Sequence, residues 1–570
     1  MTKTDPSSTM SPRAITLALC LFLLGWASKS VVAGLVEQTI LTLPAKMPVF
    51  AEQLSPNLAA FSIEMDHWPD WAGLAVGQPN AFVLQLLENL RERVGVPPSI
   101  RVGADSEDRS IVDLSYQVGN ATFPPPSANV PYPEASEVRI GQDWYALSSN
   151  FLPGTHFTWG LNLRSLNRTE TLAQASLLGD TFQGARAASL RNITDVTLEL
   201  VEVGNEPDLY SNTAVPGVVG YTTWTPSTYS STWSEYAKGV MGFMDFSGTT
   251  RFQTGALGAG ETWRPFNVRS VLEAGLLDDP DVRNKTTVFS QHLYTGVFAA
   301  GMSITPGQLM EKRNVRQIVA QRGNDIVAAR RASLTYVLGE TNSYANHGAP
   351  GISNTAESAI WGVDYMLYCA SLGVARTHFH NGVGYAYNVL QPIAGVDDGT
   401  NTNPPRAHIM PLYHAFLVVD EAIGSSGNSW VAELGTTNGT GVGSLNTVLA
   451  AYGIWEGAQT HNQTGGGSQG EGAVKRVALI NSVPYLPVNG TRDDRYALDV
   501  YLGGKGWDAS RNATIKRLFT PTTNSSHGLT WANQSFDTTD GKPAGRVVEE
   551  PLVNGTLHTY ASEVVLITFS

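Results

Sequence analysis

Two glutamates are the residues of this chain best suited to chemistry. Glu206 lies in VEVGNEPDLY (201–210) and Glu340 lies in LTYVLGETNSY (334–344), each at the end of an apolar run. Pro207 disfavours helical φ/ψ for the residue before it, which predicts that Glu206 is extended and ends a strand. Two carboxyl groups across one pocket are what glycoside hydrolysis requires, because one protonates the leaving oxygen while the other attacks the sugar or activates water.

Eight short apolar or β-branched runs alternate with longer helical patterns, and these runs are the expected strands that carry both glutamates. They lie near residues 61, 100, 158, 200, 254, 289, 337 and 377. Strands that alternate with helices favour a parallel sheet, and eight such units predict a closed (β/α)8 TIM barrel of the α/β class. Glu206 then ends the fourth strand and Glu340 the seventh, so both face the mouth at the carboxyl ends of the strands.

The pattern changes after about residue 424. Short strand-like runs separated by turn-rich segments follow, which predicts a C-terminal all-β sandwich domain. The chain has 570 residues, and single cores stop growing near ~250–300, so more than one domain is expected. We expect a signal peptide at 1–33, N-terminal strands at 34–52 that join the β-domain, the barrel at 53–424, and the sandwich at 425–570.

The N-terminus indicates secretion to the extracellular space. Arg13 precedes an apolar stretch at 14–27, which is shorter than the ~20 residues of a membrane span and is typical of a signal peptide. An uncleaved anchor is the alternative. Of the two cysteines, Cys20 would leave with the signal, and Cys369 is expected to be a buried thiol. Eleven N-x-S/T sequons predict a glycosylated surface: Asn120, Asn167, Asn192, Asn284, Asn438, Asn462, Asn489, Asn512, Asn524, Asn533 and Asn554.

Charge and motifs exclude several kinds of partner. The net charge is −13 and the basic residues form no cluster, which argues against a nucleic-acid partner and against a sulfated polyanion. We expect no membrane association once the signal is removed. His378 and His380 alternate on the eighth strand and, with His292, raise the question of zinc. Catalytic zinc needs three protein ligands and an open position, and we predict no metal and no cofactor.

Four segments carry a family resemblance: GNEPD, SQHLY, LGETNS and HNGVGYAYNVLQPI. They resemble glycoside hydrolase family 79, the β-glucuronidase and heparanase group within a clan of retaining (β/α)8 glycosidases, and most of all its fungal and bacterial exo-acting members. The resemblance spans essentially the whole mature chain. It implies that Glu206 is the acid/base, that Glu340 is the nucleophile, and that Tyr294 hydrogen-bonds the nucleophile.

The resemblance also implies how a glucuronide would be held. In this family the acid group of the sugar is bound by backbone N–H groups and tyrosine hydroxyls. Gly384 and Tyr385 in NGVGYAYN match that role, and Tyr344, four residues after the nucleophile, is a second candidate. An ordinary turn before a helix is the alternative interpretation of the glycine and its neighbour.

Five further polar residues near the predicted mouth are candidates for contact with the sugar. Asn205 offers an amide donor, while Glu64, Asp66 and Asp105 could accept from sugar hydroxyls or serve the structure alone. His292 lies two residues before Tyr294, on the same face of the strand. It is expected either to contact the substrate or to be a satisfied histidine of the barrel interior.

The leading hypothesis is a secreted, retaining exo-β-glucuronidase. Its partner would be a carbohydrate: terminal glucuronic acid, or the 4-O-methyl form, on glycans such as arabinogalactan side chains or on aryl glucuronides. The alternatives are a heparanase-like endo-acting enzyme, another retaining barrel glycosidase with a neutral substrate, and a non-catalytic sugar-binding or cell-wall protein. A pocket closed on the non-reducing side would separate exo from endo action.

Overall fold

The computed structural model describes most of the chain from residue 37 to its end. The predicted signal peptide, with Cys20, and the sequons Asn462 and Asn489 lie outside the described residues. The described ranges are 37–127, 130–212, 224–258, 266–396, 404–438, 447–457, 472–487, 495 and 497–570.

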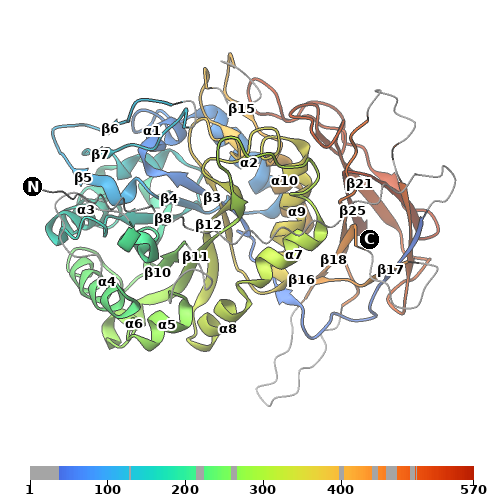
Figure 1. Cartoon of the computed structure of the whole chain (residues 1–570), viewed down its shortest axis with the longest axis horizontal. Helices are drawn as coiled ribbons and strands as arrows, with labels where there is room; N and C mark the ends of the chain where they lie inside the picture. The colour runs from blue at the N-terminus through green and yellow to red at the C-terminus, as the bar shows by residue number, and fades with distance from the viewer. Residues whose placement is uncertain are drawn as a thin grey trace, which may run out of the picture. The chain divides into compact units, whose positions relative to one another are not determined.

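Eight parallel strands close into a barrel (Figure 1). Their chain order matches the eight expected runs, and their order around the barrel is β10-β11-β12-β13-β3-β4-β8-β9. Glu206 therefore follows the fourth strand and Glu340 lies in the seventh. The closed barrel confirms the predicted (β/α)8 architecture. The strands are β3 Ala59–Glu64, β4 Ile100–Gly103, β8 His156–Leu161, β9 Thr197–Val203, β10 Arg251–Leu257, β11 Thr286–Val297, β12 Thr335–Ala345 and β13 Thr377–Asn381.

Helices connect most of these strands and cover the barrel. Helix α2 shows why they form where they do: Asn80 caps it by accepting from the N–H groups of Phe82 and Val83, and Gly95 ends it with φ 90°. Its apolar side chains recur at helical spacing and are buried in the apolar core that they share with residues of the barrel strands. The α-helices are α1 Trp68–Ala72, α2 Ala81–Val94, α3 Arg168–Phe182, α4 Pro226–Val240, α5 Val268–Glu273, α6 Pro280–Lys285, α7 Lys312–Ala320, α8 Gly323–Arg331, α9 Ala356–Ser371 and α10 Tyr413–Ile423.

The connection between β4 and β8 departs from this pattern. It contains the 3-10 helix Tyr145–Asn150 and a small sheet in the order β5-β7-β6. Strand β7 pairs antiparallel with β6 and parallel with β5. Because this connection leaves the carboxyl end of β4, the small sheet stands at the mouth of the barrel. Its strands are β5 Ser110–Val112, β6 Gly119–Thr122 and β7 Glu137–Ile140.

The C-terminal part of the chain forms two sheets, as predicted. The larger sheet runs β2-β16-β18-β19-β25-β21-β22, with β23 beside β21, and the smaller runs β17-β1-β20-β24. N-terminal strand β1 pairs parallel with β20. The strands are β1 Glu37–Thr42, β2 Glu52–Gln53, β16 Ser429–Glu433, β17 Thr436–Asn438, β18 Leu449–Glu456, β19 Arg476–Asn481, β20 Ala497–Gly503, β21 Ala513–Phe519, β22 Thr530–Trp531, β23 Glu550–Pro551, β24 Thr556–Tyr560 and β25 Glu563–Phe569; a short pair, β14 Leu390–Gln391 and β15 His408–Ile409, follows the barrel.

Both faces of the larger sheet are buried. In β19, Val477 and Leu479 belong to the apolar core shared with the smaller sheet, while Ala478 and Ile480 belong to the core shared with barrel helices. Alternation of side chains along a strand produces this division. None of the helices in the described ranges has the length and apolar character that crossing a bilayer requires.

Candidate active site

Glu206 is presented by a turn rather than by a strand. Strand β9 ends at Val203, and Glu206 has φ 47°, so the prediction that it is extended and ends the strand is wrong. Its N–H donates to the carbonyl of Ala256 in β10 (2.9 Å), and its own carbonyl accepts from Leu209 N–H (2.8 Å). Proline disfavours only the right-handed helical region, and these two hydrogen bonds hold the residue in the left-handed one. Such strain at a single position is a feature of functional sites.

Glu340 lies inside a strand, not at its end. Strand β12 continues five residues further, to Ala345, so the predicted strand end is also wrong. The carboxyl group points into the barrel and the residue is only 7% exposed. Gly339 is needed beside it, because a Cβ there would lie 2.1 Å from the hydroxyl of Ser290 on β11. Absence of a side chain at 339 therefore lets β12 pass close to its neighbour.

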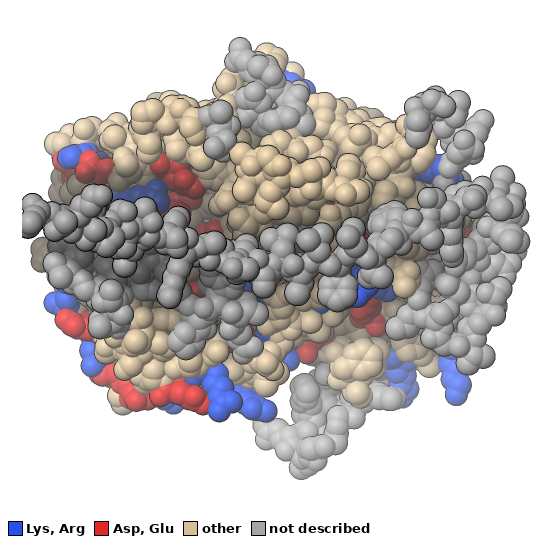
Figure 2. Space-filling model, viewed as in Figure 1, with Lys and Arg blue, Asp and Glu red and all other residues tan. Residues whose placement is uncertain are grey.

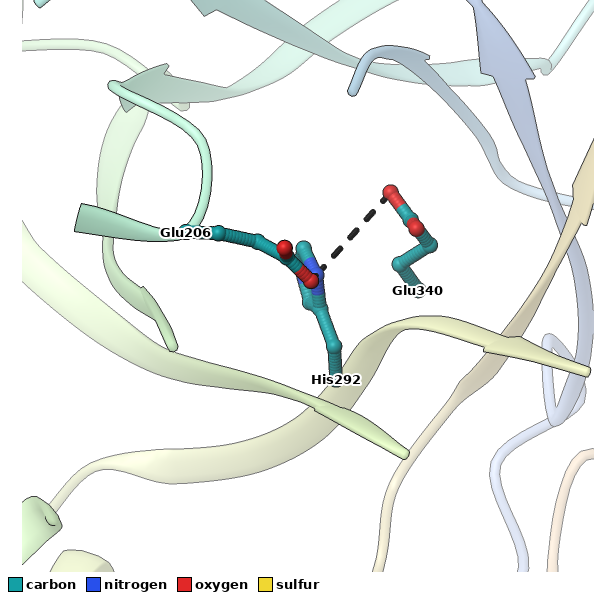
Figure 3. Close-up of side chains that lie close together, drawn as sticks. All are labelled: Glu206, His292 and Glu340. Atoms are coloured by element: carbon teal, nitrogen blue, oxygen red, sulfur yellow. Dashed lines mark hydrogen bonds and ion pairs between the residues drawn. The ribbon is translucent and has the colours of Figure 1, made fainter. Parts of the chain in front are cut away.

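The two carboxyl groups face each other (Figure 3). One oxygen of Glu206, one of Glu340 and Nδ1 of His292 all lie within 4.8 Å of one another. His292 Nδ1 is hydrogen-bonded to Glu206 Oε1 (2.9 Å) and is 3.9 Å from Glu340 Oε2. Retaining glycosidases place their carboxyl groups about 5–5.5 Å apart, and inverting ones about 6.5–9.5 Å apart. At least one oxygen of each carboxyl group is therefore close enough for the shorter, retaining spacing.

Glu340 is surrounded by donors and cations. Tyr294 Oη donates to Oε1 (2.7 Å) and Arg101 donates to Oε2 (2.9 Å), while His380 Nδ1 lies 3.9 Å from Oε2. Burial by itself would raise the pKa of this carboxyl. The charges of His380 and Arg101, together with the Tyr294 hydrogen bond, outweigh burial and hold the pKa well below its ordinary value. Glu340 is therefore an anion with the properties of a nucleophile.

Glu206 experiences the opposite conditions. Burial raises the pKa of its carboxyl well above the ordinary value, and the negative charges of Glu340 and Asp208 raise it further. Its partner His292 is neutral near pH 7, because burial lowers the pKa of that ring to about 4. Glu206 consequently keeps a proton at a pH where Glu340 has lost its own, which is the division that acid catalysis followed by nucleophilic attack requires.

Arg101 is the functional residue that the sequence interpretation missed. It lies on β4, is fully buried, and donates to Glu202 Oε1 (2.8 Å), to Asn205 Oδ1 (2.8 Å) and to Ser62 Oγ (3.0 Å) besides Glu340. One guanidinium thereby connects the first, second, fourth and seventh strands. The available signal was an arginine in the apolar run SIRVGA, since a charge is almost never fully buried without partners.

Comparison with known proteins finds relatives that cover most of the chain. Residues 451–566 match the family described as Glycosyl hydrolase family 79 C-terminal beta domain. A β-glucuronidase of Aspergillus niger is 30% identical over 518 residues, which cover 85% of this chain and 84% of that protein. The chain belongs to glycoside hydrolase family 79. A β-glucuronidase of Neurospora crassa is 28% identical over 563 residues, covering 94% of this family 79 chain and 93% of the relative.

Solved structures resemble the family 79 chain in fold. A 4-O-α-L-rhamnosyl-β-D-glucuronidase from Fusarium oxysporum has a TM-score of 0.71 at 22% identity, covering 93% of this chain and 100% of that one. A family 51 α-L-arabinofuranosidase from Bifidobacterium longum has a TM-score of 0.55 at 14% identity, covering 94% and 100%. At these identities the likeness concerns the barrel and its β-domain alone.

Several predicted contact residues of the family 79 enzyme are already engaged with protein. Glu64 is 1% exposed; its Oε1 accepts from Ser106 N–H (2.8 Å) and its Oε2 lies 3.1 Å from His380 Nε2. Asn205 is 3% exposed and donates to Asp105 Oδ1 (3.2 Å). Asp105 itself keeps 45% of its side chain exposed. Of these predicted acceptors, Asp105 is the one that remains open to a sugar.

Of the residues predicted to hold a uronate carboxyl, Gly384 and Tyr385 lie in the loop after β13 and Tyr344 lies near the end of β12. Gly384 has φ 79°, and its N–H donates to Gln391 Oε1 (3.0 Å). The sequence interpretation treated this N–H as free to bind a carboxyl group, but Gln391 already occupies it. Tyr385 is 1% exposed, and its hydroxyl has no hydrogen-bond partner among the described residues. Tyr344 is 8% exposed, beyond Glu340 on β12.

A hairpin crosses this side of the mouth. We use "mouth hairpin" for β6, β7 and the residues between them, 123–136, of which 128–129 are not described. The hairpin meets the loop after the first barrel strand twice: Ala135 N–H donates to Asp66 Oδ2 (2.7 Å), and the Phe123 ring stacks on His67 with centroids 4.9 Å apart. Asp66 is thus a structural acceptor for the hairpin.

The mouth hairpin also reaches the loops after the seventh and eighth strands. Glu134 Oε1 pairs with His347 Nε2 (2.7 Å), and the His347 ring stacks on Tyr385 with centroids 3.8 Å apart. Tyr132 packs against Gly384, where a Cβ would lie 2.3 Å from the Tyr132 ring. A segment that leaves the second strand is therefore fastened across the first, eighth and seventh.

Glu206, His292 and Glu340 also have donor atoms close enough for a metal ion. Both oxygens of Glu340 are already bound, one by Tyr294 and the other by the guanidinium of Arg101. A bound cation would have to displace that guanidinium charge, so the surroundings favour a proton-transfer site over a metal site. His378 takes no part: its Nδ1 is 3.2 Å from the Leu338 carbonyl, away from the pair.

Proposed function

We propose that this family 79 glycoside hydrolase is a secreted, retaining exo-β-glucuronidase. The observation that carries the proposal is the pair of carboxyl groups within 4.8 Å, with opposite pKa shifts, in a chain whose relatives are named β-glucuronidases. Its substrate is a glycan or small glycoside that ends in β-linked glucuronic acid or the 4-O-methyl form.

The reaction has two displacements. In the first, Glu206 donates its proton to the glycosidic oxygen while Glu340 attacks C1; the C1–O bond breaks, the alcohol leaves, and the sugar is held as an ester of Glu340. Formation of the ester removes the negative charge that helped to raise the Glu206 pKa. Glu206, now a carboxylate, takes a proton from water, the water oxygen attacks C1, and the ester bond breaks to release the sugar with its β configuration retained.

Exo action is supported by the mouth hairpin. The leaving oxygen must lie against Glu206, in the turn after the fourth strand. The far end of the bound sugar ring therefore extends towards the eighth, first and second strands. The mouth hairpin covers that side through its contacts with Asp66, His347 and Gly384. A polysaccharide could not continue through it, which opposes an endo-acting, heparanase-like enzyme. On the face shown in Figure 2, the described lysines and arginines are scattered among acidic residues rather than joined in a basic surface.

Secretion is supported by the sequons as well as by the apolar N-terminal segment. Eight sequon asparagines have a described burial, and every one of them is exposed. A protein-wide pattern of accessible sequons is expected of a glycosylated surface. Expression in a secreting host should yield extracellular protein that lacks residues 1–33 and loses mass on enzymatic deglycosylation; retention of the N-terminus in a membrane fraction would favour the anchor instead. The eight are Asn120, Asn167, Asn192, Asn284, Asn512, Asn524, Asn533 and Asn554.

The decisive test is a set of 4-nitrophenyl β-glycosides that differ only at C6: glucuronide, glucoside and xyloside. We expect the glucuronide to have the highest kcat/KM and its product to have the β configuration by NMR. Glu340→Gln and Glu206→Gln should each remove turnover. Tyr385→Phe should raise KM for the glucuronide but not for the glucoside. Preference for the glucoside, or an α product, would overturn the substrate or the mechanism respectively, and no turnover of any β-glycoside would favour a sugar-binding protein.

A further inference from the structure

A buried arginine among the helices that cover the barrel is bound to the strand that carries His292. Arg322 lies in the short link between α7 and α8 and is 5% exposed. Its Nη2 donates to the carbonyl of His292 in β11 (2.7 Å). Its own N–H donates to the Val319 carbonyl (3.0 Å), and its carbonyl accepts from Ile326 N–H (2.9 Å), so both helices fix its backbone. This arginine has no part in the two displacements described above.

The bond to Arg322 falls where the pairing of β11 is irregular. The register with β12 shifts between Gln291 and His292, because β12 has an extra residue there, Gly339. On the other side of β11, the pairing with β10 ends at Gln291. Bulges next to active sites disrupt the ladder locally and re-aim a side chain. A donor that holds the backbone at this position therefore affects where the His292 side chain points.

Side chains also hold the residues on either side of His292. Gln291 Oε1 accepts from the hydroxyl of Tyr336 (2.7 Å), and the Leu293 carbonyl accepts from the hydroxyl of Thr341. Those two bonds come from β12, whereas the bond to His292 comes from the helix layer. Three successive residues of β11 are thus fastened by side chains, and the arginine supplies the middle bond.

The ring of His292 depends on this backbone for its direction. Its Nδ1 is bonded to Glu206 Oε1 (2.9 Å), and its buried Nε2 has no hydrogen-bond partner in the described part of the chain. A histidine in a catalytic site is commonly oriented by a bond to its second nitrogen, and His292 lacks one there. Figure 3 shows the ring rising from its strand to the Glu206 carboxyl. Movement of the strand at His292 would therefore change the contact with Glu206.

We propose that Arg322 is a positioning residue for proton donation, which acts through the backbone of His292 to keep the Glu206 carboxyl aimed at the glycosidic oxygen. The inference rests on the proposed function, in which Glu206 is the acid. When the C1–O bond breaks, a poor leaving group must take the Glu206 proton, whereas a good one departs as its anion without that proton. Loss of Arg322 should therefore harm the substrates that need the proton.

The test compares phenyl and 2,4-dinitrophenyl β-glucuronide, because 2,4-dinitrophenol is a far stronger acid than phenol. The quantity measured is kcat/KM, which includes the first displacement and not the release of the sugar. General acid catalysis usually contributes ~10²–10⁴-fold, and misplacement of Glu206 should remove part of it. We expect Arg322→Met to lower kcat/KM about tenfold or more for the phenyl substrate and by less than about twofold for the dinitrophenyl substrate.

Arg511→Met is the matched control. Arg511 lies in the β-domain, and its Nη2 likewise donates to a backbone carbonyl, that of Val474 (2.9 Å). We expect this variant to keep the wild-type ratio of the two kcat/KM values. Arg322→Lys retains a cation and a donor, so it should recover part of the loss on the phenyl substrate. If Arg322→Met does not fold, Arg322→Gln takes its place with the same expectation.

Equal losses on the two substrates in Arg322→Met, or no loss on either, would overturn the positioning role, because a merely structural arginine would lower both values by the same factor. Absence of turnover of both glucuronides by the wild type would instead overturn the proposed function. The His292 ring then gives a readout that needs no turnover. Its 13C resonances, identified by their loss in His292→Phe, should shift in Arg322→Met and not in Arg511→Met. Resonances that stay in place in both variants would refute the role of Arg322.

Discussion

Replacing Glu340 by glutamine should lower the pKa of Glu206, because the negative charge of Glu340 helps to keep Glu206 protonated. Two unit charges 4.8 Å apart interact with about 3.5 kcal/mol at an effective dielectric constant of about 20. That energy corresponds to about 2.5 pKa units. The Glu206 side chain is 23% exposed, and solvent screens part of this interaction, so we expect a fall of about 1 to 2.5 units.

The assay is 13C NMR titration of protein labelled at the glutamate carboxyl carbon. Glu206→Gln identifies the Glu206 resonance by its loss, and the pKa of that resonance is compared in the wild type and in Glu340→Gln. Glu273→Gln on α5 serves as the matched control, because it makes the same change in net charge at an exposed position where salt screens its effect. A wild-type enzyme trapped as a 2-fluoroglucuronyl ester should show the same fall as Glu340→Gln.

A Glu206 pKa that moves by less than half a unit in both Glu340→Gln and the trapped ester would refute this reasoning. The switch of Glu206 from acid to base would then need another cause, such as a change in its hydrogen bond to His292. A shift of equal size in the Glu273→Gln control would show that net charge, rather than the facing carboxylate, is responsible.

Three other outcomes follow from the same contacts. A plot of wild-type kcat/KM against pH should be bell-shaped. The raised pKa of Glu206 sets the alkaline limb, where Glu206 loses its proton. The lowered pKa of Glu340 sets the acid limb, where Glu340 becomes protonated. Arg101→Met leaves buried carboxylates unpaired, so it should lower kcat/KM by at least about 100-fold and destabilise the fold by about 3–5 kcal/mol in chemical denaturation. Arg101→Lys should recover part of both the activity and the stability. A fully stable Arg101→Met enzyme would contradict this expectation. Gly384→Ala should displace Tyr132 and loosen the mouth hairpin. Activity on glucuronides extended at O4 should then rise relative to activity on the unextended glucuronide. An unchanged ratio of the two activities would argue against the hairpin as the barrier.

The strands and the two glutamates could be predicted because their signals are local. Apolar runs bounded by turns mark buried strands, and a carboxylate at the end of such a run is unusual enough to be noticed. The backbone at Glu206 could not be predicted in the same way. Proline excludes one conformation of the preceding residue, but the choice of the left-handed region depends on a hydrogen bond to Ala256, fifty residues away in sequence.

Partners distant in sequence explain the remaining differences. Arg101 was noticeable as a charge in an apolar run, but its role depends on Glu202 and Glu340 on other strands. The mouth hairpin was hidden in a proline-rich stretch without periodicity, and its contacts join loops that only barrel closure brings together. Gly384 shows the converse: its sequence motif suggested a free backbone N–H, but Gln391 occupies that donor.

The proposed roles of the two glutamates follow from which strands surround each of them. Arg101 from the second strand, Tyr294 from the sixth and His380 from the eighth all direct a donor or a charge at Glu340. The hydrogen-bond partner of Glu206 is His292, whose own pKa is too low for it to be charged near neutrality. Since the two side chains are chemically identical, exchanging these surroundings would exchange their roles. The barrel therefore acts by arranging neighbours that lower one pKa and raise the other across a gap of less than 5 Å.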